Sequence, residues 1–251
     1  MEPSASSSNA PLGSRLFYSM ASLLLLVVTF LGFRLFYLDG KAFPGHELPP
    51  PTKTLLVIHG VAMTLWILLA ALQPLLVATK NKRLHLTFGR WGAVLAALVV
   101  ILGVQTGIAA IRITPAELIR FGLAPKPFLV VPLSSVVLFG VFVAIGVWQR
   151  RRLEIHRPMM FLASLSVVSA ALGRLPVLNA WCADSTLEHA LTAFVSTVFL
   201  GWLIWGGKAL IQRSPDRAMA VGLGVMTLWF YGCSQLARTA AWESLATALL
   251  R

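Results

Sequence analysis

Seven apolar stretches, each about 20 residues or longer, fill this chain of 251 residues almost from end to end. A helix needs roughly 20 apolar residues to cross the ~30 Å hydrocarbon core of a bilayer. Backbone groups in lipid must bond within their own segment, so apolar runs of this length form helices. The sequence therefore predicts an all-α, polytopic transmembrane helical bundle of about seven spans. The predicted spans are 16–37, 54–78, 91–111, 128–148, 159–180, 189–210 and 218–238.

The composition suits a chain that lies mostly in lipid, since 57% of the residues are hydrophobic and only 12% are charged. Residues 1–14 are rich in Ser, Pro and Ala, which predicts a disordered N-terminal tail. Residues 15–251 predict a single transmembrane helical domain, because every connection between the spans is short.

The formal net charge of +12 is explained by membrane orientation. With a cytoplasmic N-terminus, twelve Lys and Arg residues lie on the inner side and six on the outer side, as the positive-inside rule requires. Membrane lipids are the expected partners of these charges, and nucleic acid is not. The inner residues are Arg15, Lys80, Lys82, Arg83, Arg90, Arg150, Arg151, Arg152, Arg157, Lys208, Arg213 and Arg217, and the outer ones are Lys41, Lys53, Arg112, Arg120, Lys126 and Arg251.

Polar residues inside spans are costly and mark functional sites, and in this chain they gather toward the outer side. At a rise of 1.5 Å per residue, His59 is expected about 8 Å below the outer boundary. The sequence therefore predicts an outward-facing polar pocket around His59, Gln105 and Arg174. The full set is Arg34, His59, Gln105, Thr106, Arg174, Gln235 and Arg238.

No Asp or Glu lies in a predicted span, so the pocket is electropositive and suits a carboxylate, a phosphate, a haem propionate or a quinone oxygen. Other roles stay open for its arginines. Arg34 and Arg238 lie near span ends, from which long side chains extend to the interface. Arg174 precedes Pro176, which frees a backbone carbonyl that an arginine can satisfy.

His59 and Met63 lie one turn apart on one face of the second span. The His59 imidazole could ligate haem iron. Alternatively, it could donate a hydrogen bond to a neighbouring helix that Gly60 allows to come close.

His85 and His156 form a second pair, expected on the inner side where the third and fifth spans begin. They are either basic residues near lipid phosphates or paired ligands of an inner haem or metal. His59, His85 and His156 are thus the candidate metal ligands. His189 follows a stretch that resembles a capping box ending at Glu188, so we interpret it mainly as part of a helix start.

Two further features leave alternatives open. Cys182 and Cys233 both lie toward the outer side, where a disulfide is one option and two free thiols are the other. Gly103 and Gly107 form a Gly-x-x-x-Gly pattern, which lets either a neighbouring helix or a second copy in a homo-oligomer approach closely. No hydrolase motif or phosphate loop is present, so the sequence leaves open whether the chain is an enzyme.

Four motifs occur in one order: HGVAMTLW at 59–66, LHLTFGR at 84–90, HRPMM at 156–160 and GRLP at 173–176. In these motifs, residues 54–180 resemble a family of bacterial polytopic inner-membrane proteins that carries no assigned activity. The resemblance implies a multi-pass protein of the bacterial inner membrane. In that family a His-Pro dipeptide follows the sixth span, and this chain has no His-Pro at that place. A fainter similarity to membrane b-type cytochromes and oxidase-assembly membrane proteins implies a respiratory-complex partner.

We therefore expect a membrane protein that binds a small molecule, with haem b or a quinone as the guest, in a redox or redox-accessory role. His59, His85 and His156 are the candidate ligands, and Arg174 and Gln105 are expected beside the guest. One alternative is a cofactor-free transporter or receptor for an anionic or lipidic solute. Another is an assembly or scaffold protein in which these residues only fix helix packing.

Overall fold

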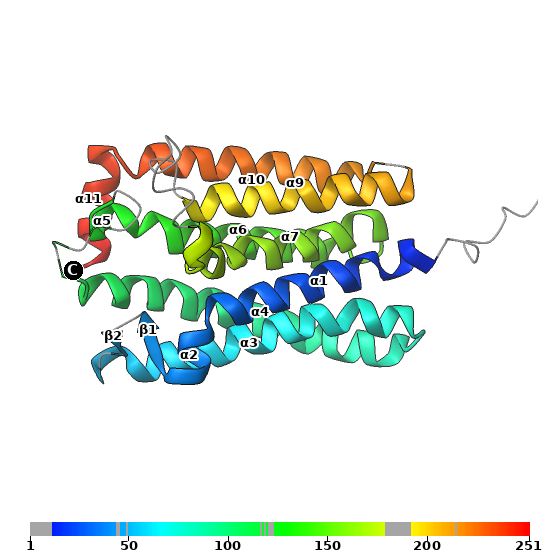
Figure 1. Cartoon of the computed structure of the whole chain (residues 1–251), viewed down its shortest axis with the longest axis horizontal. Coiled ribbons are helices and arrows are strands. Elements are labelled where there is room, and N and C mark those ends of the chain that lie inside the picture. The colour runs from blue at the N-terminus through cyan, green and yellow to red at the C-terminus, as the bar shows by residue number, and fades with distance from the viewer. Residues whose placement is uncertain are drawn as a thin grey trace, which may run out of the picture.

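The protein is a bundle of long apolar helices, which confirms the predicted all-α membrane architecture (Figure 1). The structure is a computed structural model, and it describes residues 12–43, 46–48, 50–115, 117, 119, 123–178, 192–213 and 215–251. Six segments are long and apolar enough to cross a membrane, and a shorter apolar helix covers Leu16–Gly32 within α1. The chain is therefore an integral membrane protein with several spans.

The long helices are α1 (Leu12–Gly32), α3 (Pro50–Ala78), α4 (Lys82–Arg112), α6 (Val130–Trp148), α7 (Leu153–Leu172), α9 (Thr192–Gln212) and α10 (Arg217–Leu236). Short elements lie between and after them: α2 (Arg34–Asp39), the antiparallel strands β1 (Lys41–Phe43) and β2 (His46–Glu47), α5 (Pro125–Phe128) and α11 (Ala240–Leu249). The short elements gather at one end of the bundle (Figure 1).

The opposite end holds the three tight turns between α3 and α4, between α6 and α7, and between α9 and α10 (Figure 1). We call it the basic end, because these turns carry Lys80, Arg150, Arg151, Arg152 and Arg213. It corresponds to the inner side predicted from the sequence, and its position relative to the cytoplasm stays a prediction.

Two helices differ from their predicted spans in ways that matter for the site. Helix α4 begins at Lys82, nine residues before the predicted start, because Asn81 caps it by accepting a hydrogen bond from the Leu84 N–H at 3.3 Å. Helix α7 runs from Leu153 to Leu172, so it begins and ends earlier than predicted. It stops shortly before Pro176, since the residue that precedes a proline avoids helical backbone angles.

Helix α7 is the central helix of the bundle and contacts α1, α3, α6, α9 and α10. Thirteen of its 20 residues are buried, more than a lipid-facing helix could bury. It packs closely against α1 at Gly32, where a side chain would overlap the backbone carbonyl of Ala171. In the core, Leu162 of α7 belongs to the same apolar cluster as Phe139 of α6 and Phe230 of α10.

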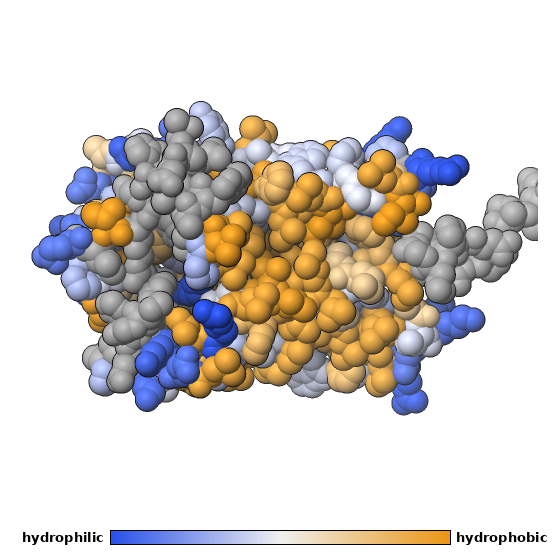
Figure 2. All heavy atoms as spheres, viewed as in Figure 1, coloured by the Kyte–Doolittle hydropathy of each residue, from blue (hydrophilic) through white to orange (hydrophobic). Residues whose placement is uncertain are grey.

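An apolar belt covers the outside of the bundle between two more hydrophilic ends (Figure 2). Large apolar side chains stand fully outward in it, with Leu210 82% and Leu228 73% exposed. In water such a surface would drive aggregation, whereas acyl chains cover it at no cost. The belt therefore marks the part of the protein that lies in lipid.

Candidate functional site: a histidine pair at the basic end

Most buried hydroxyl groups in the described part of the bundle bond to carbonyls of their own helix. Thr197 donates to Ala193 O at 2.6 Å, and Ser166 donates to Ala163 O at 2.8 Å. These bonds satisfy the hydroxyl groups locally and leave little chemistry in the core. Polar side chains that form contacts between helices include a group of histidines and a buried ion pair.

His85 lies in the first turn of α4 and contacts Gln73 of α3. The Gln73 amide also meets two backbone groups of α4, and these fix its orientation. Its nitrogen faces the carbonyl oxygen of His85 at 3.3 Å, and its oxygen accepts from the Gly89 N–H at 3.0 Å. In this orientation the amide nitrogen donates to Nδ1 of His85. The His85 ring is therefore held from α3 rather than left at the interface.

His156 lies in α7 and is held by the facing helix α6. Its Nδ1 lies 2.8 Å from the carbonyl oxygen of Gly146. A carbonyl only accepts, so Nδ1 carries the hydrogen and the neutral ring has a free lone pair on Nε2. Gly146 is small enough for the approach, since a Cβ there would lie 2.7 Å from Sδ of Met160.

The two imidazoles come from separate helical hairpins, α3–α4 and α6–α7, and both lie at the basic end. His85 lies close enough to His156 and Arg157 for their charges to interact. The sequence predicted this pair from the two helix starts, and both helices begin at the basic end of the structure. Among the described side chains, no three His, Cys, Asp or Glu residues gather as ligands of a metal ion.

The hydrogen bonds of the two rings determine which of their nitrogens could ligate a haem iron. Each axial ligand must present a nitrogen lone pair to the iron. His156 presents one at Nε2, with its Nδ1–H bonded to a carbonyl in the way that metal-binding histidines usually are. At His85, Nδ1 is engaged by the Gln73 amide, so this nitrogen is not free to ligate a metal.

His59 lies far from this pair, in the half of α3 nearer the other end. Fourteen residues separate it from Gln73, which is about 21 Å along a helix. It faces α4, where a Cβ on Gly103 would lie 3.7 Å from Cε1 of His59. Its buried Nδ1 and the buried hydroxyl of Thr106 have no hydrogen-bond partner among the described residues.

The predicted outward pocket is not assembled as a single cluster. Gln105 is exposed, on the same side of α4 as Leu98 and Ile101, whereas His59 meets the opposite side at Gly103. Arg174 donates to the carbonyl oxygen of Ala170 at 2.7 Å, and its guanidinium carbon lies 4.4 Å from the centre of the Phe33 ring. The arginine thus satisfies a carbonyl near the end of α7.

The glycine pattern of α4 faces inward. A Cβ on Gly103 would lie 2.7 Å from Val136, and one on Gly107 would lie 3.4 Å from Pro132. Both neighbours belong to α6, so the pattern brings two helices of the same chain together. Cys233 is buried, and its proposed disulfide partner Cys182 lies outside the described residues, as does His189.

The sequence interpretation missed a buried ion pair at the basic end. Lys208 of α9 and Asp216 before α10 form a salt bridge, and their side chains are 7% and 14% exposed. The Asp216 carboxylate also accepts from the Tyr18 hydroxyl at 2.8 Å and from the Met219 N–H at 3.0 Å. Burial raises the pKa of Asp216, but the hydrogen bonds from Lys208, Met219 and Tyr18 outweigh it and hold the pKa below its ordinary value.

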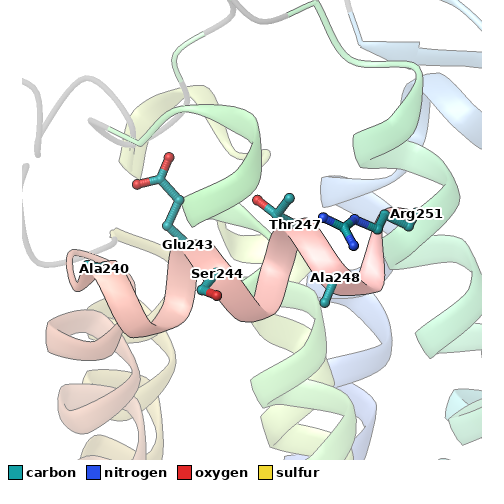
Figure 3. A pocket seen from close by; sticks show the side chains of 6 residues that line it. All are labelled: Ala240, Glu243, Ser244, Thr247, Ala248 and Arg251. Carbon is teal, nitrogen blue, oxygen red and sulfur yellow. The ribbon is translucent and has the colours of Figure 1, made fainter.

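Two hollows open at the end opposite the histidine pair. One, of about 460 Å³, runs along α11 between Glu243, Thr247 and Arg251 (Figure 3). The other, of about 510 Å³, lies against Tyr37 and Lys53. Both are shallow and open to solvent, and neither includes His59, Gln105 or Arg174.

Comparison of the chain with models of protein families, with curated proteins and with solved structures finds no match.

Proposed function

We propose that this membrane protein binds a small redox-active molecule of the quinone class at the His85–His156 pair, in a redox or redox-accessory role. One observation carries the proposal: two hairpins separated along the sequence each have a histidine at the basic end, near enough for their charges to interact, and each ring is held by a second residue. Rings fixed in this way are pre-organised for a guest, because their orientation costs nothing on binding.

The surroundings of the pair favour a lipid-soluble guest. Each ring is partly accessible, and His85 lies beside Leu84 and Leu86, which are 40% and 61% exposed on the apolar surface. A quinone dissolved in the bilayer reaches such a site from the side. Its polar oxygens then need hydrogen-bond partners near the headgroups, and the imidazoles supply them.

Of the two guests expected from the sequence, a quinone needs only hydrogen-bond partners, whereas haem needs a free lone pair on each ligating ring, and Nδ1 of both rings is already engaged. The arginines at this end, including Arg157, favour electron-rich oxygens.

The test uses the full chain in lipid nanodiscs. A visible spectrum is recorded oxidised and then reduced with dithionite, and a short-tailed benzoquinone is titrated by calorimetry. We expect no Soret band and saturable binding that His85→Ala and His156→Ala each weaken at least tenfold. His59→Leu, about 21 Å away along α3, is the control and leaves the affinity unchanged.

Two results would overturn the proposal. A Soret band that both histidine variants abolish would establish haem at the pair. A colourless protein that binds no quinone or hydroquinone would favour the cofactor-free solute receptor or the scaffold role.

A further inference from the structure

The hollow of about 510 Å³ between α2 and the start of α3 has both charged and apolar walls. Asp39 and Lys53 line it together with Tyr37, Leu48 and Val57. Its volume lies within the range of about 300–1,000 Å³ that is usual for small-molecule sites. One carboxylate, one ammonium and an apolar wall in the same hollow suit an amphipathic guest that carries a charge of each sign.

Contacts between α2 and its neighbours hold the wall of the hollow in place. The Phe36 ring packs on Gly60 of α3, where a Cβ would lie 2.8 Å from Cζ of the ring. The Tyr37 hydroxyl donates to Oγ1 of Thr64 at 2.9 Å, because the Thr64 hydrogen is already used on the Gly60 carbonyl. The Tyr37 ring also stacks on Phe30, with the ring centres 5.7 Å apart. The wall is therefore formed before a guest arrives, which lowers the cost of binding.

The two charges of the hollow are available to a guest. Asp39 and Lys53 are both exposed, and within the described part of the chain neither belongs to an ion pair. Asp39 ends α2, and a carboxylate at a helix C-terminus is unfavourable unless a cation lies near it. Lys53 lies at the start of α3, whose first turn has no acidic residue, and a helix N-terminus favours a negative group. The hollow therefore offers one place for a cation and another for an anion.

The hollow lies at the level where lipid headgroups meet the apolar belt. The membrane-spanning segment of α3 begins at Thr52, one residue before Lys53. An apolar stripe continues from the hollow along one face of α3 through Val57, Val61 and Leu65, which are 40%, 54% and 51% exposed. A lipid with its headgroup in the hollow can therefore lay an acyl chain on this stripe.

We propose that this hollow binds a phospholipid of the ethanolamine class, with its phosphate at Lys53 and its ammonium at Asp39. The ethanolamine ammonium has three N–H groups for the Asp39 carboxylate to accept, as a lysine ammonium has. A choline headgroup carries the positive charge without an N–H, and a glycerol headgroup carries no positive charge. The site lies at the end opposite the histidine pair and is independent of the function proposed above.

The experiment titrates the full chain in detergent with phosphatidylethanolamine, phosphatidylcholine and phosphatidylglycerol of identical acyl chains, and native mass spectrometry measures the binding. We expect phosphatidylethanolamine to bind about fivefold more tightly than either other lipid, the effect of one exposed ion pair. Equal affinities, or tighter binding of another lipid, would overturn the proposal. Glycerophosphoethanolamine, which has no acyl chains, should bind far more weakly. Binding as tight as that of the lipid would assign the hollow to a soluble zwitterion instead.

Two substitutions separate the roles of the charges. Asp39→Asn should abolish the preference for phosphatidylethanolamine over phosphatidylcholine, whereas Lys53→Gln should weaken both lipids equally, because both carry the phosphate. Glu243→Gln and Lys126→Gln remove the same charges outside this hollow and should change neither affinity. All four side chains are exposed, so the unfolding temperature without lipid should stay constant. A preference that survives Asp39→Asn would refute the assignment of the ammonium to Asp39.

Discussion

The hydroxyl of Tyr18 donates a hydrogen bond to the carboxylate of Asp216 at 2.8 Å, across 198 residues of sequence. Lys208 lies between them, bonded to the Tyr18 oxygen at 2.9 Å and paired with the Asp216 carboxylate. The three groups join α1 to the α9–α10 hairpin. Each polar atom is satisfied by the others, which is the condition for charges to lie buried near lipid.

Asp216→Asn should destabilise the protein strongly. The ammonium of Lys208 would stay buried without its counter-ion, and removing one partner of such a pair costs about 3–5 kcal/mol. The measurement is the thermal unfolding temperature in detergent. Glu243→Gln on the exposed side of α11 is the control and should change little.

The double variant Lys208→Met with Asp216→Asn should lose less stability than Asp216→Asn alone. It leaves no charge buried, so the two substitutions are not additive. If the loss of stability in the double variant equalled the sum of the losses in the two single variants, the two charges would not be coupled to each other.

Acid should weaken the same contact. The folded pKa of Asp216 lies below the ordinary value of 3.8, so its stabilising effect is complete well above pH 3.8. It is lost as the pH falls through the lower folded pKa. We expect the gap in unfolding temperature between the native protein and Asp216→Asn to stay constant from pH 7 to about pH 5 and to narrow below pH 3.8. A gap that widened on acidification would contradict the sign of this pKa shift.

Gly32→Ala should destabilise the packing of α1 on α7. The added methyl group would overlap the backbone of Ala171, and backbone cannot move aside as a flexible side chain can, so we expect a loss of about 1–3 kcal/mol. Gly224→Ala is the matched control, because nothing lies within 4 Å of its Cβ position. The control should be neutral or slightly stabilising, since alanine favours helix more than glycine does.

His59→Leu should leave the unfolding temperature unchanged or raise it. Nδ1 of His59 is buried without a partner among the described residues, and replacing an unsatisfied polar group with an apolar one removes a penalty. A clear drop in stability would instead indicate that a bound water or solute pairs with His59 and Thr106. Such a result would support the solute pocket that the sequence predicted near the outer side.

The helices and the histidine pair were predictable from sequence, because both depend on apolar run length and order along the chain. His85 and His156 begin two helices that enter from the same side, so topology alone brings them near each other. The face on which a residue lies was not predictable. Gln105 was expected in a pocket but lies on the outer surface of α4, whereas Gln73 contacts His85.

The ion pair escaped prediction for a related reason. Lys208 was counted with the orientation charges at the inner side, and nothing in its neighbourhood along the chain distinguishes it from Arg213. Its burial depends on the turn after α9, which brings Asp216 back onto it, and on Tyr18 from the first helix. The two residues lie on either side of a turn, and the periodicity of a single helix or strand says nothing about a contact across a turn.

The bond between Tyr18 and Asp216 also sets an order of events during biosynthesis. Tyr18 leaves the ribosome 198 residues before its partner, which at 5–20 residues per second is a delay of about 10–40 s. During that time the first helix can already pack against α3 and α7, but its bond to Asp216 cannot yet form. Lys208 and Asp216 come together within one hairpin as soon as it forms, and Tyr18 can join them only when this last long hairpin of the chain has entered the membrane.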